Sequence, residues 1–327
     1  MKILVIQTAF IGDVVLATPI LEALYIQYPT AQLDMLVRKG NEGLLQGHPF
    51  LNRLWIWDKK QKWTSMRKLI HNFRSEQYDL VINAQRFFSS GLMTVLSGAK
   101  KTIGFDKNPL SHFFSVRRPH RIGEGHEVGR NMLLLQDVVN QLVTKPKLYP
   151  TANDEAIVSE MLRTKLDKNT NYICMAPTSV WFTKQWPAAR WGMLIQGIPE
   201  SVHIFLLGAK GDAALVTNII NSYPRKNVDN LAGQLNFLQS AALMRGASMN
   251  YVNDSAPLHF ASAVNAPVTA IFCSTIPDFG FGPLSDHSRV VQTSENLACR
   301  PCGLHGYKAC PKGHFECTNI ELSAFRL

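Results

Sequence analysis

The chain has 327 residues, 46% of them hydrophobic and 18% charged, and a formal net charge of +10. This composition is typical of a packed globular protein, and the length suits two domains of ordinary size. No stretch approaches 18 uncharged apolar residues, so we expect no transmembrane helix. The apolar start at residues 1–6 is too short for a signal-peptide core, which predicts a cytoplasmic protein with reduced cysteines.

The charge is divided unevenly between the two halves of the chain. Residues 1–150 hold 20 Lys and Arg against 11 Asp and Glu, a net charge of +9, whereas residues 151–327 hold 14 against 13. A basic half implies an anionic partner, such as nucleic acid, an anionic membrane surface or a phosphorylated acceptor. The simpler explanation, a charge that only keeps the protein soluble, rarely separates so cleanly between halves.

Apolar strands and helices alternate along the first half. We expect strands at residues 2–7, 32–37, 53–57, 78–83 and 100–105, and helices at 14–28, 63–76, 89–96 and 127–142. This βαβ start predicts a parallel, doubly wound sheet that binds ligands at the carboxyl ends of its strands. No G-x-G-x-x-G follows the first strand, which argues against a dinucleotide fingerprint. Residues 107–130 are basic and without periodicity, and we expect a long loop there.

Asp13 follows the first strand, at one of these carboxyl ends. A carboxylate in this position can take a proton from an acceptor hydroxyl. It can equally cap the helix that starts at Val14, and by position alone capping is the commoner role.

Two stretches of the second half suit a phosphate. The first strand there, at residues 172–175, is followed by a loop that offers hydroxyls and one lysine, Lys184. Further along, Asp254 or Ser255 can cap a short helix with Pro257 in its first turn, and such a helix N-terminus attracts anions. Asp212, after another strand and a glycine turn, suits either a ribose hydroxyl pair or a helix cap.

Three motifs carry a resemblance to a known family. Gly12-Asp13 followed by Pro19, the loop from Pro177 to Pro187, and the run from Asp254 to His259 resemble, in the same order, motifs of the ADP-heptose:lipopolysaccharide heptosyltransferase family, glycosyltransferase family 9. Thr178 and Ala256 depart from the family pattern, which usually has glycine at both positions. The resemblance implies the GT-B fold, an α/β fold with two Rossmann-like doubly wound domains facing across a cleft. Residues 1–150 would bind the acceptor, and residues 151–327 would bind the nucleotide sugar.

By this resemblance the protein is an inverting, metal-independent glycosyltransferase. It would move a heptose from ADP-heptose to the lipopolysaccharide inner core, a phosphorylated lipid A-Kdo acceptor, at the inner leaflet of the inner membrane. Asp13 would be the catalytic base, and Lys184 would balance the charge of the leaving diphosphate. The donor site would comprise Thr178, Ser179, Thr183, Lys184, Asp212, Asp254, Ser255, Ala256 and His259. The acceptor site would comprise Gly12, Arg86, Arg117, Arg118 and Arg121.

Other interpretations stay open at this stage. The enzyme could use another nucleotide sugar or acceptor, or be a sugar-nucleotide epimerase, although we identify no further acid/base carboxylates for that reaction. A nucleic-acid-binding protein would explain the basic half but not Lys184 and Asp254, so we expect no nucleic acid partner. We expect no required cofactor. The tail has four closely spaced cysteines that suggest either a structural zinc or free thiols: Cys299, Cys302, Cys310 and Cys317.

Overall fold

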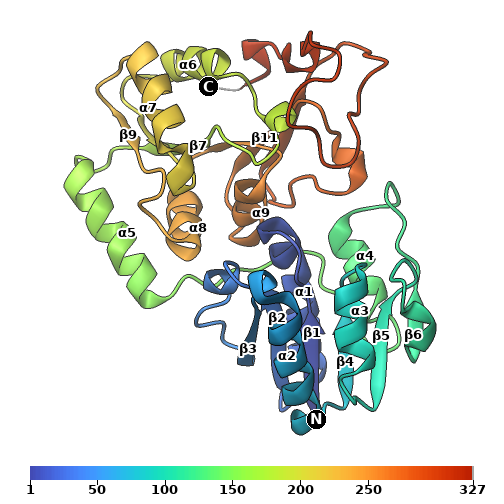
Figure 1. The fold of residues 1–327 in the computed structure, drawn as a ribbon. Helices are drawn as coiled ribbons and strands as arrows, with labels where there is room; N and C mark the ends of the chain where they lie inside the picture. The colour runs from blue at the N-terminus through green and yellow to red at the C-terminus, as the bar shows by residue number, and fades with distance from the viewer. Residues whose placement is uncertain (326–327) are drawn as a thin grey trace. The chain divides into compact units, whose positions relative to one another are not determined.

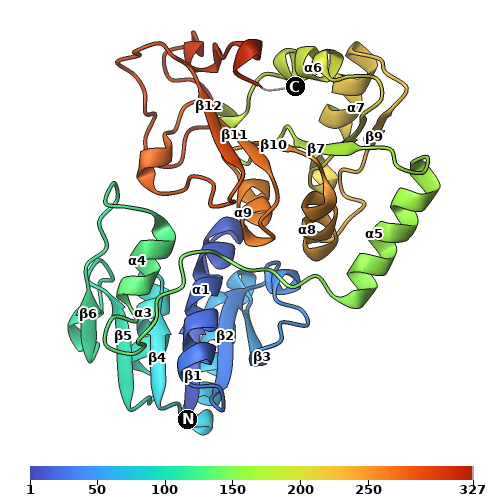
Figure 2. The ribbon, with the colours of Figure 1, turned by 180° about the vertical axis from the view of Figure 1, so that it is seen from behind.

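The protein consists of two compact units, Met1–Tyr149 and Pro150–Leu327. They are the blue-to-green and green-to-red parts of the ribbon in the computed structural model (Figures 1 and 2), which describes residues 1–325. Arg326 and Leu327, at the end of the predicted second domain, lie outside the described residues. The division falls one residue before the predicted boundary. Among residues 1–325 no helix is both long and apolar enough to cross a membrane.

Unit 1 is built on a six-stranded parallel sheet in the order β3-β2-β1-β4-β5-β6. Its strands are β1 (Lys2–Ile6), β2 (Gln32–Arg38), β3 (Leu51–Trp57), β4 (Leu80–Asn83), β5 (Lys101–Phe105) and β6 (Val116–Arg118). The order reverses between β1 and β4, which are neighbours although two strands separate them in sequence. In doubly wound sheets ligands bind at this switch point, outside the carboxyl ends of the strands.

The helices of unit 1 are α1 (Ile11–Gln27), α2 (Lys62–Glu76), α3 (Phe88–Val95) and α4 (Glu127–Leu133). Pro19 lies inside α1 without ending it. Proline cannot donate to the carbonyl four residues back, that of Val15, and the hydroxyl of Thr18 donates to this oxygen instead at 2.7 Å. The replacement bond explains why α1 runs as one helix past the proline.

Two predictions for unit 1 were wrong. Residues 107–130 do not form one long loop, because β6 pairs in parallel with β5 and a short 3-10 helix spans Ser111–Phe113. The helix predicted for 127–142 ends at Leu133, and the chain then continues in turns. A three-residue edge strand with the sequence Val-Arg-Arg has no apolar alternation, so its pairing could not be seen in the sequence.

Unit 2 repeats the same topology. Its parallel sheet has the order β12-β11-β10-β7-β8-β9, which is the order of unit 1 with the strands renumbered. The strands are β7 (Tyr172–Ala176), β8 (His203–Leu206), β9 (Val228–Asn230), β10 (Asn250–Asn253), β11 (Val268–Phe272) and β12 (Ser288–Gln292). The helices are α5 (Ala152–Lys165), α6 (Ala188–Gly197), α7 (Ala213–Ser222), α8 (Phe237–Gly246) and α9 (Ala256–Ala263). The sequence did not predict β12. The switch point lies between β7 and β10.

The central strands carry the core of each unit. Residues 3–6 of β1 and the whole of β7 and β11 are buried, as expected for strands covered on both faces. In unit 2 the core extends to the end of the described chain, where Phe325 stacks on Trp186 at 5.1 Å between ring centroids. The indole of Trp186 donates to the carbonyl of Thr318 at 3.0 Å, so the cysteine-rich tail is part of the packed unit.

Candidate functional site

Asp13 and Arg86 lie at the switch point of unit 1. Asp13 is in the first turn of α1, directly after β1, and Arg86 follows β4, the parallel neighbour of β1. The Asp13 carboxylate accepts the backbone N–H of Phe10 at 3.1 Å, so it does cap its own helix. The side chain is half-buried rather than enclosed, so capping and contact with a substrate are compatible.

The surroundings of Asp13 favour its protonated form. Burial, together with the nearby Glu127 carboxylate, raises the pKa of Asp13 from an ordinary value of 3.8 to about 6. The hydrogen bond from the Phe10 N–H and the charge of Arg86 act in the opposite direction but are weaker. A carboxylate with a pKa just below neutrality is ionised at physiological pH and still accepts a proton readily, which suits a general base. No pattern in the sequence predicted this pKa shift.

Glu127 is a site residue that the sequence analysis missed. It starts α4, is buried, and accepts a hydrogen bond from Nε of Arg130 at 2.7 Å, with Nε2 of His120 at 3.1 Å on the other side. Burial raises the pKa of Glu127, but the hydrogen bonds and charge interactions with His120 and Arg130 lower it by more. The net pKa of Glu127 is therefore below its ordinary value. Glu127 therefore stays ionised and contributes the negative charge that acts on Asp13.

The three predicted acceptor arginines, Arg117, Arg118 and Arg121, lie on or just after the edge strand β6. Arg118 forms an ion pair with Asp137, and Arg121 forms one with Asp106 at 2.8 Å. Gly12, another predicted acceptor residue, is in the first turn of α1 beside Asp13. Two of the three arginines are thus already paired within unit 1, which reduces the charge that they offer to an anion.

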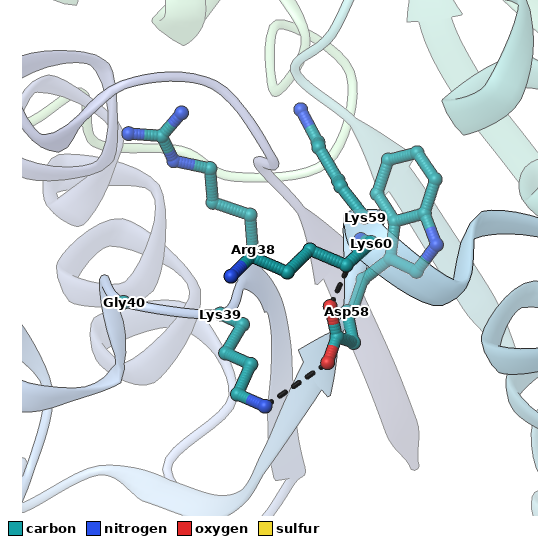
Figure 3. A pocket seen from close by; sticks show the side chains of 7 residues that line it. Arg38, Lys39, Gly40, Asp58, Lys59 and Lys60 are labelled. Atoms are coloured by element: carbon teal, nitrogen blue, oxygen red, sulfur yellow. Dashed lines mark hydrogen bonds and ion pairs between the residues drawn. The ribbon is translucent and has the colours of Figure 1, made fainter.

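A basic pocket that the sequence did not predict lies at the carboxyl ends of β2 and β3. It measures about 330 Å³ and is shown in Figure 3. Its lining residues are Arg38, Lys39, Gly40, Trp57, Asp58, Lys59 and Lys60. Four of the seven are cationic and one is acidic. Because all six strands of this sheet are parallel, the pocket is on the same edge of the sheet as Asp13.

The cationic side chains of the pocket have different interaction partners. Lys39 pairs with Asp58 at 3.0 Å, as the dashed line in Figure 3 shows. Nζ of Lys59 donates to the carbonyl of Thr8 at 2.8 Å, and the guanidinium of Arg38 lies 4.7 Å from the centre of the Phe10 ring. Burial, with Arg38 and Lys62 nearby, lowers the pKa of Lys59, the sign of a crowded positive site. Such a pocket is suited to an anionic group.

Unit 2 brings Lys184 and Asp254 together at its own switch point. Lys184 is in the loop after β7 and Asp254 directly follows β10, the parallel neighbour of β7. Nζ of Lys184 lies 2.7 Å from Oδ2 of Asp254, with 14% of the lysine side chain and 5% of the aspartate side chain exposed. The hydroxyl of Thr275 donates to the same carboxylate oxygen at 2.5 Å. The lysine is therefore fixed at its tip, where two further N–H donors remain for a ligand.

The N-terminus of α9 offers fewer donors than expected. Ser255 is its N-cap residue, and its hydroxyl donates to the carbonyl of Asn253 at 3.3 Å. Pro257 has no N–H, and the N–H of Leu258 is bonded to the carbonyl of Ser255 at 3.1 Å. In the first turn this leaves the backbone N–H of Ala256 as a donor for an anion. His259 is buried in the same turn.

The remaining predicted donor residues are Thr178, Ser179, Thr183 and Asp212. Oγ1 of Thr178 donates to Asp212 at 3.0 Å, and Asp212 accepts the N–H of Ala209 at 2.8 Å, which caps the 3-10 helix Lys210–Asp212. The predicted side-chain cap on the helix from Ala213, α7, is wrong, because Asp212 makes no such bond there. The ribose role of Asp212 stays a prediction. Ser179 lies between these and Lys184 in the same loop. Thr183 is 1% exposed, and its hydroxyl accepts the N–H of Tyr307 at 2.7 Å. A donor-binding role for Thr183 stays a prediction.

Comparison with known proteins decides the family. The family model described as "Glycosyltransferase family 9 (heptosyltransferase)" matches residues 66–307, about three quarters of the chain. The chain belongs to this family. Lipopolysaccharide heptosyltransferase 3 of Escherichia coli is 28% identical over 81% of this chain and 82% of its own length. The predicted family is confirmed.

Solved structures of this family share the fold. The family 9 glycosyltransferase of Veillonella parvula superposes with a TM-score of 0.82 at 21% identity, covering 89% of this chain and 86% of its own. The ADP-heptose lipopolysaccharide heptosyltransferase II of E. coli superposes with a TM-score of 0.78 at 24% identity, covering 98% of both chains. The predicted GT-B fold class, with two Rossmann-like doubly wound domains, is confirmed.

The cysteine-rich tail of this glycosyltransferase gives no direct sign of a metal centre. Within residues 1–325 no three His, Cys, Asp or Glu side chains are grouped so that they could hold a metal ion. Sγ of Cys299 lies 3.8 Å from Nε2 of His314, and the thiol of Cys302 donates to the carbonyl of Cys299 at 3.2 Å. All six cysteines are free thiols. Zinc at Cys299, Cys302, Cys310 and Cys317 stays a prediction that metal analysis of the purified protein would test.

Proposed function

We propose that this glycosyltransferase transfers a heptose from ADP-heptose to the inner core of lipopolysaccharide, with lipid A-Kdo as the acceptor. Family membership supports heptose as the sugar, and the name of the 28%-identical E. coli relative supports lipopolysaccharide as the class of acceptor. The observation that carries the mechanism is the Lys184–Asp254 pair at the switch point of unit 2, where doubly wound sheets bind nucleotides.

The donor diphosphate binds at Lys184 in this proposal. One N–H of the lysine goes to Asp254 and the others point to the β-phosphate, with the N–H of Ala256 as a further donor. Negative charge on the leaving diphosphate increases as the glycosidic bond breaks. A fixed cation at that position is therefore worth more in the transition state than in the ground state.

Asp13 acts as the base in the proposed reaction. The acceptor hydroxyl oxygen forms a bond to the anomeric carbon as the bond from that carbon to the diphosphate oxygen breaks. The hydroxyl proton passes to Asp13, and ADP leaves with the electron pair of the broken bond. A single displacement of this kind inverts the anomeric configuration, and Lys184 supplies the charge balance that a divalent metal would otherwise give.

The basic pocket of unit 1 is proposed to hold an anionic group of the acceptor. The pocket has four cations on the edge that carries Asp13, one of them paired with Asp58, whereas two of the three β6-region arginines are in ion pairs. This difference favours the pocket. A phosphorylated lipid acceptor would bring the enzyme to the inner leaflet of the inner membrane. We place the protein on the cytoplasmic side as a peripheral enzyme.

A transfer assay tests the proposal as a whole. The enzyme is incubated with Kdo-lipid A and with ADP-heptose, a UDP-sugar or a GDP-sugar, with and without EDTA, and products are detected by mass spectrometry. We expect one added heptose from ADP-heptose, in the presence of EDTA as well, and an inverted anomeric centre by NMR. Transfer from UDP- or GDP-sugars alone would refute the donor, and loss of transfer in EDTA would refute the metal-independent mechanism.

A further inference from the structure

The loop that carries Lys184 is held by a segment far away in sequence. Thr183 and Tyr307, 124 residues apart, exchange backbone and hydroxyl hydrogen bonds. The N–H of Thr183 donates to the carbonyl of Tyr307 at 3.1 Å, and the N–H of Tyr307 donates to Oγ1 of Thr183 at 2.7 Å. Residues 300–307, which we call the strap, therefore pair with the residue directly before Lys184.

The carboxyl end of β11 joins this contact. The Ser274 hydroxyl donates to Oγ1 of Thr183 at 3.0 Å, and the N–H of Cys302 in the strap donates to the carbonyl of Ser274 at 2.8 Å. Ser274 and Thr183 are 0% and 1% exposed, so these bonds are made without competition from water. The hydroxyl of Thr183 is thus bonded to both Ser274 and the strap.

Arg300, at the start of the strap, acts on Asp254, the ion-pair partner of Lys184, through Thr275. Its guanidinium donates to the carbonyls of Cys273 at 2.7 Å and of Thr275 at 2.8 Å, and to the side chain of Gln292 at 2.8 Å. Thr275, held in this way, directs its hydroxyl to Asp254, which pairs with Lys184. Burial lowers the pKa of Arg300 from its ordinary value, as expected for a cation bound mainly to carbonyl oxygens.

Gly306 brings the strap against Lys184 itself. Its φ of +74° is in the left-handed region, and a Cβ there would lie 2.8 Å from Oγ1 of Thr183 and 3.2 Å from Cγ of Lys184. Both distances are shorter than ordinary van der Waals contact. The absent side chain of Gly306 thus leaves the space in which the stem of Lys184 lies.

We propose that the strap is a positioning element for the transfer reaction: it sets the place of Lys184 through Gly306 and Thr183, and the place of Asp254 through Arg300 and Thr275. The proposal rests on the proposed role of Lys184 at the leaving diphosphate. The strap residues act through the lysine and its partner. A displacement of a few tenths of an ångström at Gly306 is therefore expected to change turnover more than stability.

Gly306→Ala and Gly313→Ala form a matched pair for the test. Both glycines are in the tail with nearly equal φ, +74° and +78°, but a Cβ on Gly313 would meet nothing within 4 Å. The backbone strain of alanine is common to both, so their difference isolates the contact with Thr183 and Lys184. We expect Gly306→Ala to lower kcat about 10-fold or more and to weaken ADP binding by calorimetry, whereas Gly313→Ala stays near wild type in both. Equal kcat and equal ADP affinity in the two variants would overturn the proposal.

A double-variant cycle with Lys184→Ala shows whether the strap acts through the lysine. If it does, Gly306→Ala adds little to the loss already caused by Lys184→Ala; additive losses would mean that Gly306 acts elsewhere. The second arm is tested by Thr275→Val, which removes the hydroxyl bonded to Asp254 and should weaken ADP binding, and by Thr275→Ser, which should restore it. If Lys184→Ala itself leaves ADP affinity and transfer unchanged, the proposed function of the lysine fails, which is distinct from failure of the strap.

Discussion

Replacing Asp13 with asparagine is expected to make the enzyme slower and, above about pH 6, more stable. Asparagine can still accept the N–H of Phe10, so the cap on α1 is kept while the proton acceptor is lost. Removal of a positioned base lowers turnover by about 10²–10⁴-fold. A residue that only caps its helix would show no such loss.

The stability change follows from the raised pKa. In the folded state the pKa of Asp13 is about 6 against an ordinary value of 3.8, so the folded protein binds the proton more tightly. Stability then falls as pH rises from about 4 to 6, and the whole penalty is present above that range. At 1.36 kcal/mol per unit the penalty is about 3 kcal/mol at most, and solvent screening of the partly exposed side chain makes it smaller. Asp13→Asn removes it at pH 7.5 and has no effect near pH 4.

Asp154 provides the matched control. It also lies in the first turn of its helix, α5, and its carboxylate accepts the N–H of Thr151 at 3.0 Å. Burial raises the pKa of Asp154, but bonds from Thr151 and Asn236 lower it to a net value below the ordinary one. The linkage therefore has the opposite sign, with stability present above the unfolded pKa and lost as pH falls. Asp154→Asn should destabilise the protein at pH 7.5 and leave turnover near wild type.

Two measurements check these expectations. Urea unfolding of wild type and both variants between pH 4 and 8 gives the stability differences, and kcat/KM over the same range gives the rate profile. Wild-type kcat/KM should rise with pH and level off above about 6. Near-normal turnover in Asp13→Asn, or equal stability changes for the two variants at pH 7.5, would refute the reasoning.

Three further predictions concern the ligands. Lys184→Ala should weaken ADP binding and slow transfer, and since it leaves Asp254 buried without its cation it should also destabilise the protein by about 3–5 kcal/mol. Adding Asp254→Asn should restore stability without restoring ADP affinity, and recovery of both would contradict the phosphate role. Replacing both Arg38 and Lys60 with alanine should raise the acceptor KM and leave the donor KM unchanged. The rise in acceptor KM should exceed that caused by replacing Arg117, Arg118 and Arg121; a larger rise for the three arginines would place the acceptor at β6. Acceptor affinity should fall with salt more steeply than ADP affinity, because exposed charges are screened within about 8–10 Å at physiological ionic strength, and parallel salt curves would remove the case for a charged acceptor site.

The sequence by itself determined the alternation of elements and the positions of the main site motifs. The apolar runs at residues 3–6 and 172–175 are buried strands because central parallel strands are covered on both faces, so their signal is local and strong. Asp13, Lys184 and Asp254 were predicted because each directly follows such a strand or belongs to a motif of the family. These features depend on a few neighbouring residues, and for that reason they can be predicted from the sequence alone.

Only the tertiary structure decided what those residues contact. The pairing of Lys184 with Asp254, the raised pKa of Asp13 beside Glu127, and the cation pocket at Arg38 and Lys60 all join segments that are distant in sequence. The same holds for β6, whose three residues form a strand only because β5 provides the backbone partners. Distances between side chains from different strand ends depend on the order of strands in the sheet, which no local pattern contains.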